Sequence, residues 1–324
     1  MDRPAGHAWA LVLAAGDGSR LSRVTAVAGG GHVPKQFCSF CSDRSLLTQT
    51  LERAARVVPA ERIVVVVAAQ HREHWEPELA GWPADAVVVQ PRNLGTANGL
   101  LLGALAIRRR DPAASVLVLP SDHAFEDERR LRLALRRALL AVVRSPEALV
   151  LLGIEPDEPD TGYGWIVPGA DRDGLTTSVD GFVEKPEAAR AAQLMAAGAL
   201  WSSFILAMRL QALLELYARR QPRLLRAFEH ALPPRAPRWP AASVERLYDE
   251  LPPCDFSREL LQAGAKPLRL LRVPAVGWTD LGTPERLRRS LETRRDRPDG
   301  PFRTVSKPTR TPLALEAALV AATA

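Results

Sequence analysis

The stretch LVLAAGDGSRLSRVTAVAGGGHVPKQF, Leu11–Phe37, begins as an apolar strand and continues as a loop of small residues that ends in a lysine behind a proline. Glycine lets a ligand approach the backbone closely, and successive backbone N–H groups in such a turn can surround an anion. Arg20 and Lys35 add two cations, of which the guanidinium matches phosphate oxygens. The loop therefore favours polyphosphate binding, and an ordinary strand–helix turn with surface cations is the alternative. The P-loop and dinucleotide-binding glycine patterns are absent.

Short apolar runs continue the pattern of this first strand along the chain. We expect strands at Trp9–Ala14, Ile63–Ala69, Ala86–Gln90, Val116–Pro120 and Leu149–Ile154. The runs are continuously apolar, as in strands covered on both faces, and helical patterns separate them. This alternation predicts an α/β fold with a doubly wound, mostly parallel, Rossmann-like sheet. In such sheets ligands bind beyond the carboxyl ends of the strands. After about residue 155 the pattern changes and predicts a small antiparallel excursion.

The domain organisation follows from composition. We expect residues 1–295 to form one catalytic domain and the Pro-rich, basic residues 296–324 to be a disordered tail with a short terminal helix. The net charge is +6, of which the residues from Thr293 onward, six basic and three acidic, contribute half. The remainder is mildly basic and has no basic stripe with interleaved aromatics, which argues against nucleic acid as a partner. No apolar run is long enough for a membrane span, so we expect a cytoplasmic protein.

Seven motifs then occur in one order along residues 8–290. They are LAAGDGSRL followed by PKQF, QPRNLGTANG, VLPSDH, GYGWI, VDGFVEKP, WSSFIL and GWTDLGT. In this order they resemble the sugar-phosphate nucleotidyltransferases, and Gln36 after Pro34-Lys35 is similar to the mannose-1-phosphate guanylyltransferase branch. The resemblance implies a GT-A-like nucleotidyltransferase fold whose antiparallel strands bind the sugar. It also implies an enzyme that joins a sugar-1-phosphate to a nucleoside triphosphate, most closely mannose-1-phosphate and GTP, with Mg²⁺.

The resemblance assigns roles residue by residue. The expected catalytic residues are Arg20, Lys35 and Lys185; the expected nucleotide-binding residues are Ala14, Ala15, Gly16, Gly18, Gln90, Gly95, Thr96, Ala97 and Asp122; the expected sugar-binding residues are Gly164, Glu184, Lys185 and Ser202. Asp122 and Asp280 each follow an apolar strand and are the expected metal ligands, since Mg²⁺ takes one or two protein carboxylates and completes its shell with phosphate oxygens and water. A helix N-cap is the alternative role for either aspartate.

Some alternatives stay open. Ser202 stands where the sugar motif usually has Asn, and Gln90 stands where this branch often has Glu. An amide can pair with guanine but also with uracil or thymine, so UTP or dTTP with another sugar such as glucose-1-phosphate is the nearest alternative. A non-catalytic nucleotide-sugar binding protein is the alternative from another class. A homodimer is left open.

Overall fold

A computed structural model of the 324-residue chain describes residues 6–27, 30–40, 42–234, 236, 239–262, 264 and 267–295. The predicted tail, 296–324, lies outside the described residues. The strands are β1 (Ala8–Ala14), β2 (Ile63–Ala68), β3 (Val87–Gln90), β4 (Ser115–Pro120), β5 (Leu149–Ile154), β6 (Gly164–Arg172), β7 (Thr177–Glu184), β8 (Leu200–Arg209) and β9 (Leu268–Val273). The five strands expected from the apolar runs are therefore confirmed, to within one residue at either end.

The helices alternate with the strands in the first half of the chain and cluster in the second. They are α1 (Leu46–Ala55), α2 (Arg72–Glu78), α3 (Thr96–Arg110), α4 (Glu128–Arg144), α5 (Ala188–Ala196), α6 (Leu210–Arg220), α7 (Pro222–Ala231), α8 (Ala241–Glu250) and α9 (Pro284–Arg295). Side-chain caps begin α1, α4 and α9: Ser45 accepts a hydrogen bond from the backbone N–H of Thr48, Asp127 accepts one from that of Arg130, and Thr283 accepts one from that of Arg286.

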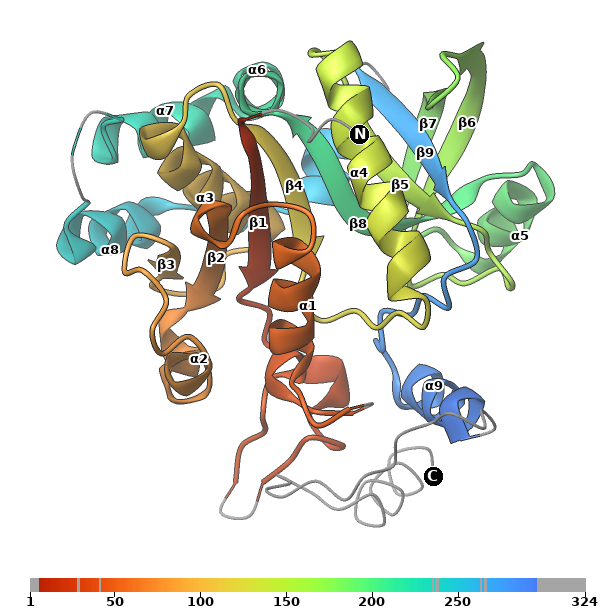
Figure 1. Cartoon of the computed structure of the whole chain (residues 1–324), viewed down its shortest axis with the longest axis horizontal. Helices are drawn as coiled ribbons and strands as arrows, with labels where there is room; N and C mark the ends of the chain where they lie inside the picture. The colour runs from red at the N-terminus through yellow and green to blue at the C-terminus, as the bar shows by residue number, and fades with distance from the viewer. Residues whose placement is uncertain are drawn as a thin grey trace.

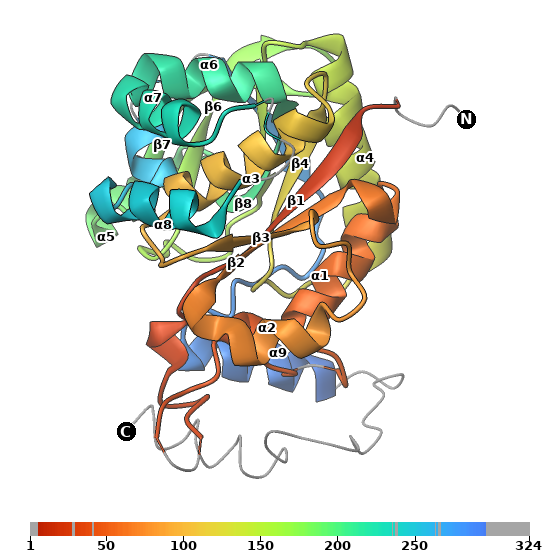
Figure 2. The ribbon, with the colours of Figure 1, turned by 90° about the vertical axis from the view of Figure 1, so that its left-hand side faces the viewer.

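The helices cover the two faces of the sheet in separate layers. Because successive side chains of a strand point to opposite faces, Leu11 and Val66 face one cluster and Val12 and Val65 face the other. Helices α3, α6, α7 and α8 supply the first cluster, and α1, α2 and α4 supply the second. Figure 1 shows α1 and α4 in front of the strands, and Figure 2 shows α3, α6, α7 and α8 on the opposite side.

The sheet differs from the prediction of a mostly parallel one. Its order is β3-β2-β1-β4-β8-β5-β9-β7-β6. The pairs among β3, β2, β1 and β4 are parallel, as is β5 with β9, but β8 runs antiparallel between β4 and β5. Strand β6 also pairs with β8, so the last five strands of that order close into a small mixed barrel. Continuous apolar runs indicate that both faces are covered, but they carry no information on strand direction.

The topology brings the ends of strands from both halves of the chain together. Strands β1, β2, β3, β4, β5 and β9 run in one direction, and β8 runs in the other. The segments after β4 and β9 are joined by an isolated antiparallel bridge between Ala124 and Thr279, with hydrogen bonds of 2.9 and 3.1 Å. Asp122 and Asp280 flank this bridge, so two motifs more than 150 residues apart meet at one place.

Candidate active site

The loop after β1 is held by the segment that carries Lys35. Gly18 has φ +64°, and a Cβ at this position would lie 2.8 Å from the backbone nitrogen of Lys35. The side-chain amide of Gln36 donates to the backbone oxygens of Ala14 and Gly16, at 3.1 and 2.8 Å. The structure therefore brings the two parts of the first motif together, and glycine is required at position 18 by both the backbone angle and the close contact.

Lys35 also reaches the two expected metal ligands. Its side chain is 5% exposed, and its ammonium lies 2.8 Å from Oδ2 of Asp122. The same ammonium donates to the backbone oxygen of Asp280 at 2.5 Å. Burial raises the pKa of Asp122, but Lys35, through its charge and its hydrogen bond, and His123 together outweigh burial and hold this pKa at about 2. Asp122 is therefore ionised at neutral pH, and its carboxylate, 38% exposed, remains accessible.

Arg20 joins the same group from the opening loop. It lies in the 3₁₀ turn Ser19–Leu21, and its guanidinium is 3.6 Å from Oδ2 of Asp280. The Arg20 side chain is 56% exposed, whereas that of Asp280 is 10% exposed. The guanidinium is half-exposed and its contact with Asp280 is longer than a hydrogen bond, so it can turn toward a phosphate without breaking one.

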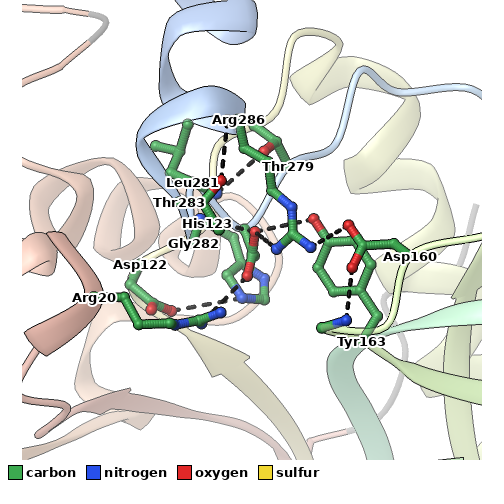
Figure 3. Close-up of polar contacts among 12 residues, drawn as sticks. Arg20, Asp122, His123, Asp160, Tyr163, Thr279, Leu281, Gly282, Thr283 and Arg286 are labelled. Atoms are coloured by element: carbon green, nitrogen blue, oxygen red, sulfur yellow. Dashed lines mark hydrogen bonds and ion pairs between the residues drawn. The ribbon is translucent and has the colours of Figure 1, made fainter. Parts of the chain in front are cut away.

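Three donors hold the other oxygen of Asp280. Oδ1 accepts from the hydroxyl of Tyr163 at 2.9 Å, from the backbone N–H of Gly282 at 2.8 Å and from the guanidinium of Arg286 at 2.9 Å. Arg286 also pairs with Asp160, and Figure 3 shows its guanidinium beside the ring of Tyr163 and joined by a dashed line to Asp160. Burial raises the pKa of Asp280, but Lys35 and Arg286 lower it more, so the carboxyl stays ionised.

Sequence reasoning did not identify Arg286, Asp160 or the role of the Tyr163 hydroxyl. Arg286 stands six residues after Asp280, in the first turn of α9, and no motif marked it. The alternative role of Asp280 as a helix N-cap is not what the structure shows: its bond from the backbone N–H of Gly282 lies before α9, and Thr283 accepts from the backbone N–H of Arg286 in the first turn of that helix. The bond from Gly282 uses Oδ1, the oxygen that also meets Tyr163 and Arg286, so Oδ2 is the oxygen of Asp280 that faces Arg20.

The expected sugar-binding residues lie on the barrel strands. Gly164 and Glu184 are cross-strand partners on β6 and β7, and a Cβ on Gly164 would lie 2.7 Å from Oε2 of Glu184. Lys185 follows with φ +47°, an uncommon angle for a residue with a side chain. Its half-exposed ammonium is 3.1 Å from Oε1 of Glu184. Ser202 lies on the neighbouring strand β8, where its hydroxyl accepts from the backbone of Phe204 at 3.4 Å.

The second expected nucleotide segment is braced by a part of the chain that carried no recognised motif. Gly95 has φ +90°, and a Cβ there would lie 2.4 Å from the backbone oxygen of Cys254. Ala97 donates its backbone N–H to that oxygen at 3.1 Å, and the hydroxyl of Thr96 accepts from the backbone of Phe256 at 2.9 Å. These contacts fix the start of α3 beside the end of β3.

Gln90 ends strand β3 and is nearly fully buried, with 1% of its surface exposed. Its side-chain oxygen accepts from the hydroxyl of Tyr248, on α8, at 3.3 Å. The amide is thereby tied to a helix of the opposite half of the chain. The structure thus joins Arg20, Lys35, Asp122 and Asp280 in one set of contacts. Of the other expected residues, Ala14, Ala15, Gly16 and Gly18 lie at the end of β1 and in the loop after it, and the rest lie on the β3–α3 segment or on and next to the barrel strands.

Comparison with known proteins identifies the family to which this arrangement belongs. A family model described as nucleotidyl transferase matches residues 9–296. The chain belongs to the nucleotidyl transferase family. It is 34% identical over 227 residues to the xanthan biosynthesis protein XanB of Xanthomonas campestris pv. campestris (strain B100), which is 68% of this chain and 46% of that protein. It is 33% identical over 231 residues to the mannose-1-phosphate guanylyltransferase of Escherichia coli (strain K12), 68% of this chain and 47% of that protein.

Among solved structures, a Thermus thermophilus protein described as "mannose-1-phosphate geranyltransferase" superposes with a TM-score of 0.70 at 30% identity. The match covers 85% of this chain and 76% of that one. The resemblance found in the sequence motifs is therefore confirmed at the level of the family. The chain matches about half the length of the curated relatives named above.

The two aspartates of this nucleotidyl transferase have the chemistry that Mg²⁺ requires. Both offer ionised carboxylates, the hard oxygen ligands that Mg²⁺ prefers. Among the described residues, the contact of Oδ2 of Asp280 is the one with Arg20 at 3.6 Å, and the side chain of Asp122 is 38% exposed. Within the described part of the chain, no group of three or more His, Cys, Asp and Glu side chains could hold a metal ion. The pair therefore fits a cation that takes its remaining ligands from phosphate and water.

In the described ranges, every helix is too short or too polar to cross a bilayer.

Proposed function

We propose that the chain catalyses nucleotidyl transfer between a nucleoside triphosphate and a sugar-1-phosphate, and that mannose-1-phosphate and GTP are the substrates and GDP-mannose the product. An oxygen of the sugar phosphate forms a bond to the α-phosphorus. The bond from that phosphorus to the bridging oxygen of the β-phosphate breaks, and its electron pair leaves with pyrophosphate. The observation that carries this proposal is the convergence of Arg20 and Lys35 with Asp122 and Asp280 at one point.

The charges of the site suit a reaction without a general base. A phosphate monoester has its second pKa near ~6, so the attacking sugar phosphate is already mostly a dianion at pH 7. What the protein must supply is positioning and charge neutralisation. Arg20 and Lys35 supply two cations on the nucleotide side, and Lys185 supplies one on the sugar side. Mg²⁺ held by Asp122 and Asp280 would neutralise further phosphate charge.

The choice of base and sugar rests on relatives and on two residues. The E. coli relative is named a mannose-1-phosphate guanylyltransferase, which favours GTP and mannose-1-phosphate. The buried amide of Gln90 would meet the base, and Glu184, with Gly164 beside it, would meet the sugar hydroxyls. Ser202 has a shorter reach than an amide side chain, so we expect a contact to the sugar through this residue to be weak.

The test is a substrate matrix. The purified chain is incubated with Mg²⁺, inorganic pyrophosphatase and each of four nucleoside triphosphates against mannose-1-phosphate, glucose-1-phosphate and other sugar-1-phosphates, and phosphate release is measured. We expect the signal to be greatest for GTP with mannose-1-phosphate and to be lost in Asp122→Asn. A signal greatest for UTP or dTTP would support the same reaction but with a different nucleotide as the substrate. If no substrate pair released phosphate while the chain still bound nucleotide sugars, a binding role would replace the catalytic one.

A further inference from the structure

Three aromatic residues, Tyr163, Trp201 and Trp278, form a cluster next to the two aspartates. The ring centroids of Tyr163 and Trp278 are 5.0 Å apart, and the ring of Trp201 is 4.8 Å from Tyr163 and 6.2 Å from Trp278. Tyr163 precedes the first residue of β6, Trp201 lies on β8, and Trp278 lies in the segment after β9. The cluster therefore joins the strands of the expected sugar site to the segment that carries Asp280.

Tyr163 is the residue of this cluster that contacts Asp280. The residue is 7% exposed, and its hydroxyl donates to Oδ1 of Asp280 at 2.9 Å. An ionised carboxylate can only accept a hydrogen bond, so the Tyr163 hydroxyl is the donor in this contact. The guanidinium of Arg286 lies 4.0 Å above the centre of the ring. The ring and the hydroxyl together fix which oxygen of Asp280 is left for other ligands.

Trp278 contacts His123, which in turn lies next to Asp122. The indole nitrogen of Trp278 is 3.2 Å from Nδ1 of His123. An indole N–H can only donate, so Nδ1 of His123 must accept and its proton must lie on Nε2. Nε2 faces Oδ1 of Asp122 at 3.6 Å. Trp278 thus selects the tautomer that presents an N–H to Asp122.

We propose that Tyr163 and Trp278 act as one aromatic clamp of positioning residues, which orients Asp280 directly and Asp122 through His123, so that the two carboxylates are held for one divalent cation. The inference rests on the metal role given to these aspartates in the proposed function. It adds residues that need not touch either substrate. Tyr163 also accepts the backbone N–H of Lys185 at 3.1 Å through its own backbone oxygen, so the clamp adjoins the expected sugar-phosphate site as well.

The test measures metal binding apart from activity. Mn²⁺ serves as the probe, and the free ion is quantified by electron paramagnetic resonance in titrations of the full chain. The double variant Asp122→Asn with Asp280→Asn supplies the background. Residues that hold metal ligands through hydrogen bonds typically change metal affinity by about 10–100-fold when they are replaced. We expect Trp278→Phe and Tyr163→Phe each to weaken Mn²⁺ binding about tenfold or more.

A matched control separates this effect from the loss of any buried indole N–H. Trp75 is 6% exposed, and its indole donates to the backbone oxygen of Ala68 at 2.9 Å, away from the aspartates. Trp75→Phe should leave Mn²⁺ binding unchanged. A second pair of variants serves if Trp278→Phe does not fold. His123→Gln can place an amide N–H near the position of Nε2, whereas His123→Ala cannot, so the Gln variant should bind Mn²⁺ more tightly than the Ala variant.

Each result decides the matter. Mn²⁺ affinity unchanged in Tyr163→Phe and Trp278→Phe, or equal in the two His123 variants, would overturn the clamp. Wild-type binding no better than that of the double aspartate variant would overturn it too. The substrate matrix is run on the same wild-type preparation. If no substrate pair released phosphate but the variants bound Mn²⁺ more weakly than wild type, the proposed reaction would be rejected and the clamp retained.

Discussion

The ammonium of Lys35 lies 2.8 Å from the carboxylate of Asp122 and 2.5 Å from the backbone oxygen of Asp280. One buried cation therefore joins the loop after β1 to the segments after β4 and β9. Lys35 is 4% exposed, so its charge is shielded from bulk water and acts strongly on its neighbours. The position of this one ammonium links the proposed nucleotide loop to both proposed metal ligands.

We expect Lys35→Met, which keeps most of the length and removes the charge, to lower turnover by about 10²–10³-fold, the effect typical of removing one group that stabilises transition-state charge. The measurement is steady-state pyrophosphate release with the best substrate pair. Lys185→Met is the matched control on the sugar side. It should raise KM for the sugar-1-phosphate more than KM for the nucleotide. If the turnover of Lys35→Met stayed within a few-fold of wild type, Lys35 would have no catalytic role.

The pairing with Lys35 also predicts a dependence of stability on pH. Burial alone would raise the pKa of Asp122, but the charge and hydrogen bond of Lys35, together with His123, hold it at about 2, below the ordinary value of 3.8. A carboxyl whose pKa is depressed by folding contributes stability that is complete above its ordinary pKa and is lost as pH falls toward the folded value. The stability advantage of wild type over Asp122→Asn should therefore shrink as pH falls from about 4 to about 2.

Urea unfolding midpoints of wild type and Asp122→Asn, measured side by side across this range, test the expectation. Aspartates with lowered pKa values that do not contact Lys35, such as Asp111 and Asp173, titrate in both proteins and cancel in the difference. A difference between the two midpoints that does not change with pH would contradict an ion pair between Lys35 and Asp122.

The sequence predicts the strands of the first half well because their physics is local. A run such as Ile63–Ala68, with four consecutive valines, suits a strand covered on both faces wherever it pairs. The insertion of β8 between β4 and β5 was not predictable in this way. Strand β8 follows the β6–β7 hairpin in the chain, and its pairing depends on closing the barrel with β6 rather than on its own composition.

The same distinction applies to the site. Arg20, Lys35, Asp122 and Asp280 stand in motifs, so their meeting could be expected. Arg286 contacts Asp280 and Asp160 through tertiary packing of α9, and Tyr248 meets Gln90 from α8. Such partners are set by where helices pack, and an arginine or tyrosine on a helix has many ordinary roles. The sequence therefore indicates the groups that face ligands better than the groups that hold them.

Glycine at position 18 gives a steric test of the loop. Gly18→Ala would combine a positive φ with a Cβ 2.8 Å from the backbone of Lys35, whereas Gly31→Ala, at φ +82°, would meet no atom within 4 Å. Both variants incur the strain of a left-handed backbone, about 1–2 kcal/mol. Gly18→Ala should lower stability further and should also raise KM for the nucleotide, because Lys35 must shift. Urea unfolding and nucleotide kinetics measure the two effects. Equal stability and equal KM in the two variants would show that the contact with Lys35 is unimportant.

The buried network around Arg286 predicts a large cost for a single substitution. The side chains of Arg286, Asp160 and Asp280 are each 10–12% exposed, and the guanidinium pairs with both carboxylates. Removing one partner of a buried ion pair typically costs about 3–5 kcal/mol, because it leaves charge buried without compensation. Arg286→Ala should therefore lower the free energy of unfolding by about this amount, and Arg286→Lys should recover part of it.

An exposed pair on the same helix is the control. Arg288 pairs with Glu292 at 2.7 Å, with both side chains 54% exposed. Arg288→Ala should change the free energy of unfolding by about 0.5 kcal/mol or less, the usual size for exposed pairs one helical turn apart. Urea titrations of the three variants give the comparison. If Arg286→Ala cost no more than Arg288→Ala, Asp280 would have to be held by Lys35, Tyr163 and Gly282 alone, and α9 would have no part in positioning it.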